Sequence, residues 1–554
     1  MTAIPTIRAE FQALVDRFHA ERLRHHPTWG TALGRHEHDG ALEAYTLDAQ
    51  AAEVAGLREL RLAFEVLDEG ALTPVEAHDR AWLLATISGA IDAATVDAPL
   101  ERNPDVYASG LTESAFTLVN RDFAPAEQRL AALLSRMARM PAVLREAEAN
   151  LTTPPQVYTE LALEQLAGNR GFFEATVLEA FAGRVSGAAM RALREACAEV
   201  VEAFTRYERF LADALLPRST GAFALGEDAF VRKLYHDELV ELPLERLLAL
   251  GEADLARNQA ELRSLAGALA PGQPVREVLA SLGREHVPPE ALLATTRDML
   301  DEIRAFIAER GLLTLPEAQP VRVVETPPFM RATVTAAMDT PGPFETVSTE
   351  AYYYMTLPSP HWPPEEQEAY MAQWTEAGIS NLSVHEAYPG HYVQFLLLPR
   401  FPSVTRQIMW APSNAEGWAH YCEQMMLEAG FQGNAPRPRI AMLTDALLRN
   451  ARLVAGIKLH TQGMTVPEAQ AFFEREAFLS WPGARVEAWR GTVDPTYGYY
   501  TLGKLMLLKL RADYAEQRGS GFCLREFHDA FLAQGPVPLP LVREALLGTR
   551  EGLL

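Results

Sequence analysis

Residues 127–150 read EQRLAALLSRMARMPAVLREAEAN, and their leucines and methionines return at intervals of one, three or four residues. This spacing places apolar side chains along one face of an α-helix. The period recurs through most of the 554 residues, with proline and glycine between the periodic segments. It predicts a mainly α-helical fold built from many helices. The other periodic segments are residues 191–214, 240–265, 289–311, 415–429, 438–462, 467–480 and 500–517.

The pattern changes between about residues 315 and 360. The segments VRVVE at 321–325 and TEAYYYMTL at 349–357 are rich in β-branched and aromatic residues, which is typical of strands. They predict a small β-sheet near residues 320–358. We therefore expect a mainly helical lobe at residues 1–315. Residues 316–554 would add the sheet and a second helical lobe, packed with the first as one continuous unit.

The composition excludes some partners. The chain has 50 basic and 73 acidic side chains and a net charge of -23, whereas nucleic acids and anionic membranes attract clustered Lys and Arg. The three cysteines are far apart and odd in number, so they predict neither a disulfide framework nor a CxxC metal site. They fit a reducing cytosol.

The N-terminal sequence meets Arg8, Glu10 and Asp16 before any apolar run long enough for a signal peptide. No segment approaches the roughly 20 apolar residues of a membrane span. We expect a cytoplasmic protein without a membrane partner. These patterns do not determine the oligomeric state.

The run HEAYPGH at residues 385–391, followed by EGW from Glu416, carries the most specific chemical signal. It brings two imidazoles and two carboxylates within 32 residues. His385, His391 and Glu416 are of the types that bind catalytic zinc and leave a fourth position to water. Glu386, next to the first ligand, could take a proton from that water.

The two histidines are six residues apart, not four as in HExxH. On an unbroken helix they would point about 120° apart, with about 9 Å between them along the axis. Pro389 and Gly390 predict a local bulge that restores the four-residue geometry, because proline cannot donate a helix hydrogen bond and glycine adopts unusual conformations. The alternative is a helix that ends at Tyr388, with His391 capping a neighbour.

The third ligand is expected from the helical segment that Glu416 opens. Glu416, His420 and Glu423 share one face of this segment. We favour Glu416 as the ligand, with Glu423 or His420 orienting a histidine from behind. His420 is the rival ligand.

Several later residues could serve the substrate. An attacked carbonyl needs a donor for its oxyanion, which a Tyr, His or Arg near the metal can provide. Each of these residues could also be a packing or surface residue. The aromatic segment around Tyr353 could be core, or an edge strand that binds an extended peptide. The candidate donors and binding residues are Arg452, His460, Arg490, Tyr497, Tyr499 and Tyr500.

With these motifs, the chain resembles the bacterial domain-of-unknown-function 885 family, helical proteins related to zinc carboxypeptidases of the Taq type. The family's HExxxGH reads here as His385, Glu386 and His391, and its EGWA segment begins at Glu416. Weaker similarity covers RNPDVY (102–107), GEDAFVRKLYHDEL (226–239), the ARLV segment with His460, and YTLGKL (500–505).

The resemblance implies a mainly helical peptidase-like fold that encloses a cleft. It also implies His385, His391 and Glu416 as zinc ligands and Glu386 as the base. His460, Arg490 and Tyr500 would be substrate or oxyanion contacts. The chain departs from the family at Gly456, where an Asp is common, and at Asp494-Pro495-Thr496, which replaces Pro-Gly-Gln.

Two functions remain as hypotheses. The first is a zinc metallopeptidase for short peptides or peptide-like amides, acting as a carboxypeptidase, dipeptidase or amidase. The second is a non-catalytic helical peptide-binding protein whose metal is structural or absent. Glu386 favours the enzyme, because a structural zinc site has no use for a non-ligand carboxylate there.

Overall fold

The computed structural model describes residues 6–317, 320–327, 331 and 334–554. It is mainly α-helical, as the periodicity predicts, and it divides into two compact units. The main segment of the first unit ends at Phe223, whereas the expected boundary was residue 315. The reason is that helices after Ala224 pack against C-terminal helices. The first unit comprises Met1–Phe223, Pro328–Ala332 and Pro341–Thr349, and the second comprises Ala224–Pro327, Thr333–Thr340 and Glu350–Leu554.

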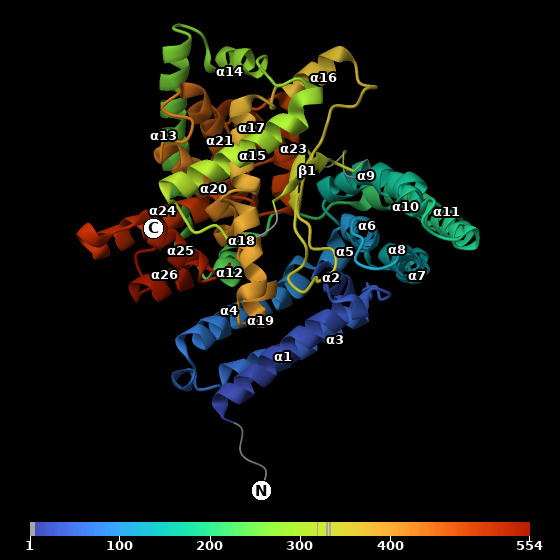
Figure 1. Cartoon of the computed structure of the whole chain (residues 1–554). Coiled ribbons are helices and arrows are strands. Elements are labelled where there is room, and N and C mark those ends of the chain that lie inside the picture. Colours follow the sequence, from blue (N-terminus) through green and yellow to red (C-terminus); the bar gives the residue numbers. More distant parts are fainter. Residues whose placement is uncertain (1–5, 318–319, 328–330, 332–333) are drawn as a thin grey trace. The chain divides into compact units, whose positions relative to one another are not determined.

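The first unit is built from helices (Figure 1). They are α1 (Ile7–His25), α2 (Pro27–Ala32), α3 (Leu47–Glu65), α4 (Pro74–Asp92), α5 (Pro99–Arg102), α6 (Asp105–Val119), α7 (Ala126–Met137), α8 (Met140–Asn150), α9 (Gln156–Gly171), α10 (Val177–Phe181) and α11 (Gly187–Arg209). The periodic segment 127–150 forms two helices, since Pro141 lies in the first turn of α8, where a missing N–H costs little. The apolar faces of α6 to α11 form one core.

The second unit holds the candidate site. Its helices are α12 (Glu227–Glu238), α13 (Leu244–Leu269), α14 (Val275–Gly283), α15 (Leu292–Arg310), α16 (Pro364–Met371), α17 (Glu376–Glu386), α18 (His391–Leu397), α19 (Val404–Ile408), α20 (Pro412–Glu428), α21 (Pro436–Thr461), α22 (Val466–Glu476), α23 (Trp481–Val493), α24 (Tyr499–Arg518), α25 (Leu524–Leu532) and α26 (Leu539–Leu547). Helix α21 packs along α13, and α20 packs along α24. Helix α17 contacts both α20 and α21, so these helices surround the HEAYPGH segment.

The predicted small sheet is present in the second unit. Its strands are β1 (Arg322–Glu325), β2 (Ala336–Asp339) and β3 (Tyr352–Met355), in the order β1-β3-β2. Strand β3 is central, parallel to β1 and antiparallel to β2. The alternative of an edge strand around Tyr353 is therefore wrong. Both edges of β3 are paired, and the Tyr353 side chain is fully buried.

One helical stretch among the described residues, Pro74–Arg102, is long and apolar enough to cross a membrane. This finding differs from the expectation that no segment is apolar enough to span a membrane. Length and composition alone decide this test, and a core helix of a soluble protein meets it as well. In the structure, 22% of its apolar 18-residue window is buried.

Candidate metal centre

The HEAYPGH segment breaks a helix. Helix α17 ends at Glu386 and α18 begins at His391, with a cis Tyr388–Pro389 peptide between them. The bulge predicted within one continuous helix is therefore wrong, because four residues leave the helical path. The break nevertheless brings the two histidines together, as expected: the centroids of the His385 and His391 rings lie 4.8 Å apart.

Gly390 allows this break. Its N–H donates to the Val384 carbonyl at 3.1 Å, and a Cβ atom at this position would lie 1.8 Å from the His385 carbonyl oxygen. Only a residue without a side chain fits so close to another backbone. The indole N–H of Trp418 on α20 donates to the Pro389 carbonyl at 2.8 Å, which ties the break to the helix that carries Glu416.

The three expected ligands converge. Glu416 Oε2 lies 3.5 Å from His385 Nε2 and 3.3 Å from His391 Nε2. One ligand atom from each side chain falls within 4.8 Å of the others, the spacing of a group that could hold a metal ion. Both histidines are buried and Glu416 is partly buried.

Glu423 fixes the first histidine. Its Oε1 lies 2.7 Å from His385 Nδ1, so Nδ1 carries the proton in the neutral ring and Nε2 keeps its lone pair for a metal. Arg449 donates to both oxygens of Glu423 at 2.8 and 2.9 Å, and Asn381 donates to Oε2 at 3.3 Å. His420 also contacts Glu423, at 3.2 Å, and lies outside the metal-sized group.

These contacts shift the ionisation of the centre. Burial and Arg449 lower the pKa of His385, but hydrogen bonds to Glu416 and Glu423 outweigh them and raise it to about 9. Burial raises the pKa of Glu416, yet the two imidazoles hold it well below its ordinary value. Without metal, the centre therefore keeps an anionic carboxylate beside a protonated His385.

The residues present fit a divalent cation such as zinc. Two imidazole nitrogens and one carboxylate form the usual protein share of a catalytic zinc site, and a carboxylate behind one histidine is its usual support. Among the described residues, no hydrogen bond of ordinary geometry reaches the buried His391 Nδ1. A buried polar atom without a partner calls for a bound ion or water.

Two tyrosines border the centre. The ring of Tyr500, at the start of α24, lies parallel to His385 at 6.3 Å. Burial raises its pKa and Glu416 adds to this, so its hydroxyl stays a donor. Burial raises the pKa of Tyr353 well above its ordinary value, and the nearby Glu386 carboxylate raises it further. A fully buried Tyr353 cannot bind substrate as a surface residue.

The other predicted residues divide into two groups. Arg452 pairs with Glu487 through two hydrogen bonds of 2.7 Å and lies 5.5 Å from the Tyr500 ring centroid. Arg490 lies near the same aromatic cluster, with its guanidinium 5.9 Å from the Tyr497 ring centroid. Both arginines therefore lie in the region of Tyr500.

His460 does not join them. One ring nitrogen contacts the Gly491 carbonyl at 2.8 Å, and the other accepts from the Leu225 amide at 3.4 Å. These contacts place a buried ring between the start of α12 and the end of α23. Both ring nitrogens thus have protein partners, which does not favour the predicted role of His460 as an oxyanion donor.

The comparisons with known proteins agree with these motifs. The profile of a bacterial protein family of unknown function, DUF885, matches residues 27–546. The chain belongs to the DUF885 family. A comparison with curated proteins gave no match.

Two solved structures resemble the DUF885 chain along nearly its whole length. A candidate lipoprotein of unknown function from Shewanella oneidensis has a TM-score of 0.81 at 25% identity, covering 98% of this chain and 100% of its own. A candidate lipoprotein from Colwellia psychrerythraea has a TM-score of 0.84 at 19% identity, covering 98% and 99%. The second likeness concerns the fold alone.

The two departures from the DUF885 motifs lie against each other. A Cβ atom at Gly456 would fall 3.0 Å from the Pro495 carbonyl oxygen and 3.1 Å from the Tyr497 ring. A longer side chain at position 456 would therefore displace the Asp494-Pro495-Thr496 segment.

Sequence reasoning missed the residues behind the DUF885 centre. Arg449 and Asp445 lie four residues apart on α21, and Asn381 on α17 donates to Asp445 at 2.6 Å. An acidic and a basic residue four positions apart on one helix face were the available signal. Glu238 was also missed. It is fully buried and accepts from the Ser413 amide at the start of α20, at 2.8 Å.

Proposed function

We propose that this DUF885 protein is a zinc-dependent hydrolase of short peptides or peptide-like amides. The observation that carries the proposal is the convergence of His385, His391 and Glu416, with Glu386 next in sequence to the first ligand and outside the ligand group. A catalytic site needs such a carboxylate, whereas a structural zinc site normally fills its fourth position with protein.

Each side chain of the centre would have a separate role in the hydrolysis. Zinc held by the three ligands would lower the pKa of a bound water to about 7 and polarise the scissile carbonyl. Glu386 would accept the proton of the attacking water and return it to the leaving amine. Tyr500, whose raised pKa keeps its hydroxyl protonated, would donate to the oxyanion.

The support behind the ligands favours this proposal. Glu423, Arg449 and Asn381 form a buried hydrogen-bonded group behind His385. Such groups set the orientation and basicity of a metal-binding imidazole. A metal-free binding protein gives no reason for an imidazole to be oriented in this way by a buried carboxylate and its arginine partner.

The test combines metal analysis with a peptide library. Purified protein should contain about one zinc per chain, and it should cleave a mixed library of short peptides, read by mass spectrometry, until a chelator is added. Glu386→Gln should keep the zinc and lose turnover by a factor of about 100 to 10,000. A metal-loaded protein that cleaves nothing would favour the binding protein instead.

The location can be tested separately. We keep the cytoplasmic location as a prediction, but the relatives described as candidate lipoproteins favour a membrane-anchored location as the alternative. Fractionation of cells that produce the natural protein separates the two, since an anchored protein sediments with membranes and a cytoplasmic one does not.

A further inference from the structure

We infer that the cavity beside α17 is a substrate subsite for a basic side chain, that of lysine or arginine in a peptide. The cavity has a volume of about 1140 Å³ and lies within the second unit, lined by residues of α14, α15, α17 and α21. Ligand pockets for small molecules usually hold roughly 300 to 1,000 Å³, so a peptide segment fits. The inference rests on the proposed function for the reaction itself.

The cavity borders the same helix that carries the proposed base. Gly378 and Leu382 of α17 line it, and Glu386 follows Leu382 by four residues. Positions four apart lie on one face of a helix, about 40° and 6 Å from each other. The face of α17 that borders the cavity therefore continues to Glu386.

The wall of the cavity formed by α21 also lies near the candidate metal centre. Helix α21 lines the cavity with Asp445 and Arg452, and the Arg452 guanidinium lies 5.5 Å from the ring centroid of Tyr500. Tyr500 in turn lies beside His385. A peptide cleaved at the metal centre could thus extend a neighbouring side chain into the cavity.

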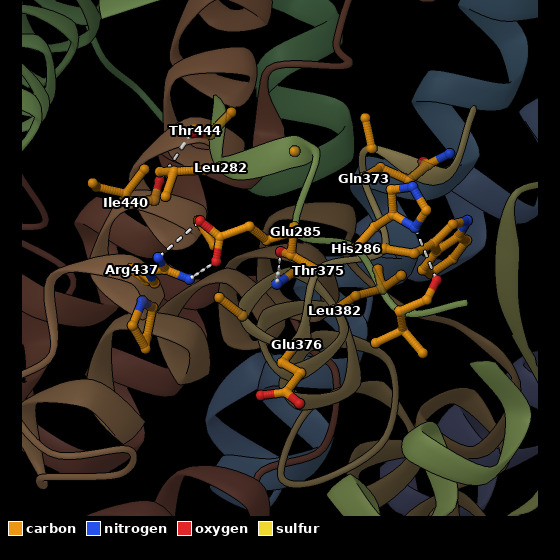
Figure 2. A pocket seen from close by; sticks show the side chains of 18 of the residues that line it. Leu282, Glu285, His286, Gln373, Thr375, Glu376, Leu382, Arg437, Ile440 and Thr444 are labelled. Atoms are coloured by element: carbon orange, nitrogen blue, oxygen red, sulfur yellow. Dashed lines mark hydrogen bonds and ion pairs between the residues drawn. The ribbon is translucent and has the colours of Figure 1, made fainter. Parts of the chain in front are cut away.

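The apolar wall suits the stem of a long side chain. Figure 2 shows Leu282, Leu382 and Ile440 among the lining residues, with Glu376 on α17 below them. Lysine and arginine bury their methylene stems against such surfaces while the charged end reaches a polar partner.

The charges of the cavity decide which end group it prefers. Arg437 pairs with Glu285, as Figure 2 shows, at 2.9 Å for one of their bonds. Arg452 pairs with Glu487, so neither arginine offers an unbalanced positive charge.

Two carboxylates remain. Among the described residues, neither Glu376 nor Asp445 forms an ion pair within 4.0 Å. Asp445 accepts a hydrogen bond from Asn381 at 2.6 Å, and its electrostatic partner Arg449 is also the partner of Glu423. Burial raises the pKa of Asp445, which is expected of a carboxylate that lacks a full counter-charge. A cationic end group in the cavity would therefore lie beside Glu376 and would favour the charged form of Asp445.

The experiment measures binding without turnover. Full-length Glu386→Gln protein is titrated calorimetrically with three capped peptides, acetyl-Ala-Lys-Ala-amide and its norleucine and glutamate counterparts. The lysine peptide should bind about tenfold more tightly than the norleucine peptide, the usual gain from a partly desolvated ion pair. The glutamate peptide should bind most weakly.

Two substitutions in the same background locate the site. Glu376→Gln and Asp445→Asn should each reduce the affinity for the lysine peptide by about three- to tenfold and leave the norleucine peptide unchanged. Glu376 lies in the first turn of an exposed helix end, so its substitution leaves the fold intact even where Asp445→Asn disturbs Asn381. Glu365→Gln is the matched control, since Glu365 lies in the first turn of α16 and outside the cavity lining.

The outcomes separate the two proposals. Equal affinity for the lysine and norleucine peptides, no binding of the lysine peptide, or no effect of Glu376→Gln would overturn the subsite. If the lysine peptide binds as expected and the zinc-loaded wild type cleaves no peptide, the subsite stands and the proposed hydrolase activity fails.

Discussion

Gly417 of α20 and Gly503 of α24 bring the backbones of these two helices into direct contact. A Cβ atom on Gly417 would lie 2.5 Å from the Gly503 Cα atom, and one on Gly503 would lie 1.9 Å from the Ser413 carbonyl oxygen. A side chain on either glycine would thus overlap the backbone of the other helix. The contact holds Glu416, one residue before Gly417, near Tyr500, three residues before Gly503.

Replacing Gly503 by alanine should separate α20 from α24. Overpacking of this kind costs about 1 to 3 kcal/mol of unfolding free energy, measurable by denaturant titration. Because Glu416 moves with α20, zinc affinity should fall as well. The matched control is Gly267→Ala on α13, where no atom lies within 4 Å of the added Cβ. There the substitution should stabilise the protein by about 0.5 to 1 kcal/mol. Equal effects at both positions would contradict the contact.

Replacing Glu423 by glutamine should weaken zinc binding by about 10- to 100-fold, because His385 loses the carboxylate that orients it. The substitution also removes the closest partner of buried Arg449, at a cost of about 3 kcal/mol or more. Competition with a chromophoric chelator measures the first effect and thermal denaturation the second. Glu428→Gln at the exposed end of α20 should leave zinc affinity unchanged and, since it removes only the ion pair with Arg511, cost about 1 kcal/mol or less. Zinc affinity as high as in the wild type would exclude Glu423 as the support of His385.

Zinc binding should depend on pH through His385. Its pKa in the metal-free protein is about 9, so a proton must leave before the metal binds at neutral pH. Apparent zinc affinity should therefore rise about tenfold for each pH unit, up to about pH 9. Titrations at several pH values from 6 to 9 test this. An affinity that does not change over this range would show that His385 is already neutral.

The same pKa predicts how the metal-free protein responds to pH. The folded pKa lies above the ordinary value of 6.5, so protonated His385 stabilises the fold below about pH 6.5 and this contribution is lost as the pH rises to about 9. Zinc should reverse the loss, since the metal takes the place of the proton. Urea titrations with and without zinc should diverge as the pH rises.

Glu238 predicts a second pH effect at the start of α20. Burial raises its pKa to about 8 from an ordinary value of 4.5, so the folded state favours the neutral acid. Its contribution to stability is full below about pH 4.5 and declines as the pH rises to about 8. Glu238→Gln keeps a neutral group in the contact with Ser413 and removes this decline. The stability of the wild type relative to the variant should fall between pH 5 and 8, by a few kcal/mol at most.

The control for Glu238 lies nearby in the chain. Glu241 is exposed, and Glu241→Gln should show no such difference at any pH. A wild type and a Glu238→Gln variant whose relative stability is constant from pH 5 to 8 would mean that Glu238 is ionised in the folded protein.

The candidate ligands could be recognised from the sequence because their arrangement is local. Glu416, His420 and Glu423 share a helix face, and a Pro-Gly pair lies between two histidines. The form of the interruption was not predictable. A bulge and a complete break both follow from Pro389 and Gly390, and only the packing of Trp418 on the Pro389 carbonyl shows which one forms.

The sequence by itself determined that the chain is mainly helical, where its small sheet lies, and that a Pro-Gly pair separates two nearby histidines. These are properties of single segments, since helical and strand periods are set by the backbone geometry of each segment. The tertiary structure alone decided that β3 is a central strand, that both ring nitrogens of His460 have protein partners, and that Arg449 contacts the glutamate behind His385. Contacts between residues far apart in the chain depend on how the helices pack against one another. The hydrophobic period of a single segment does not predict them.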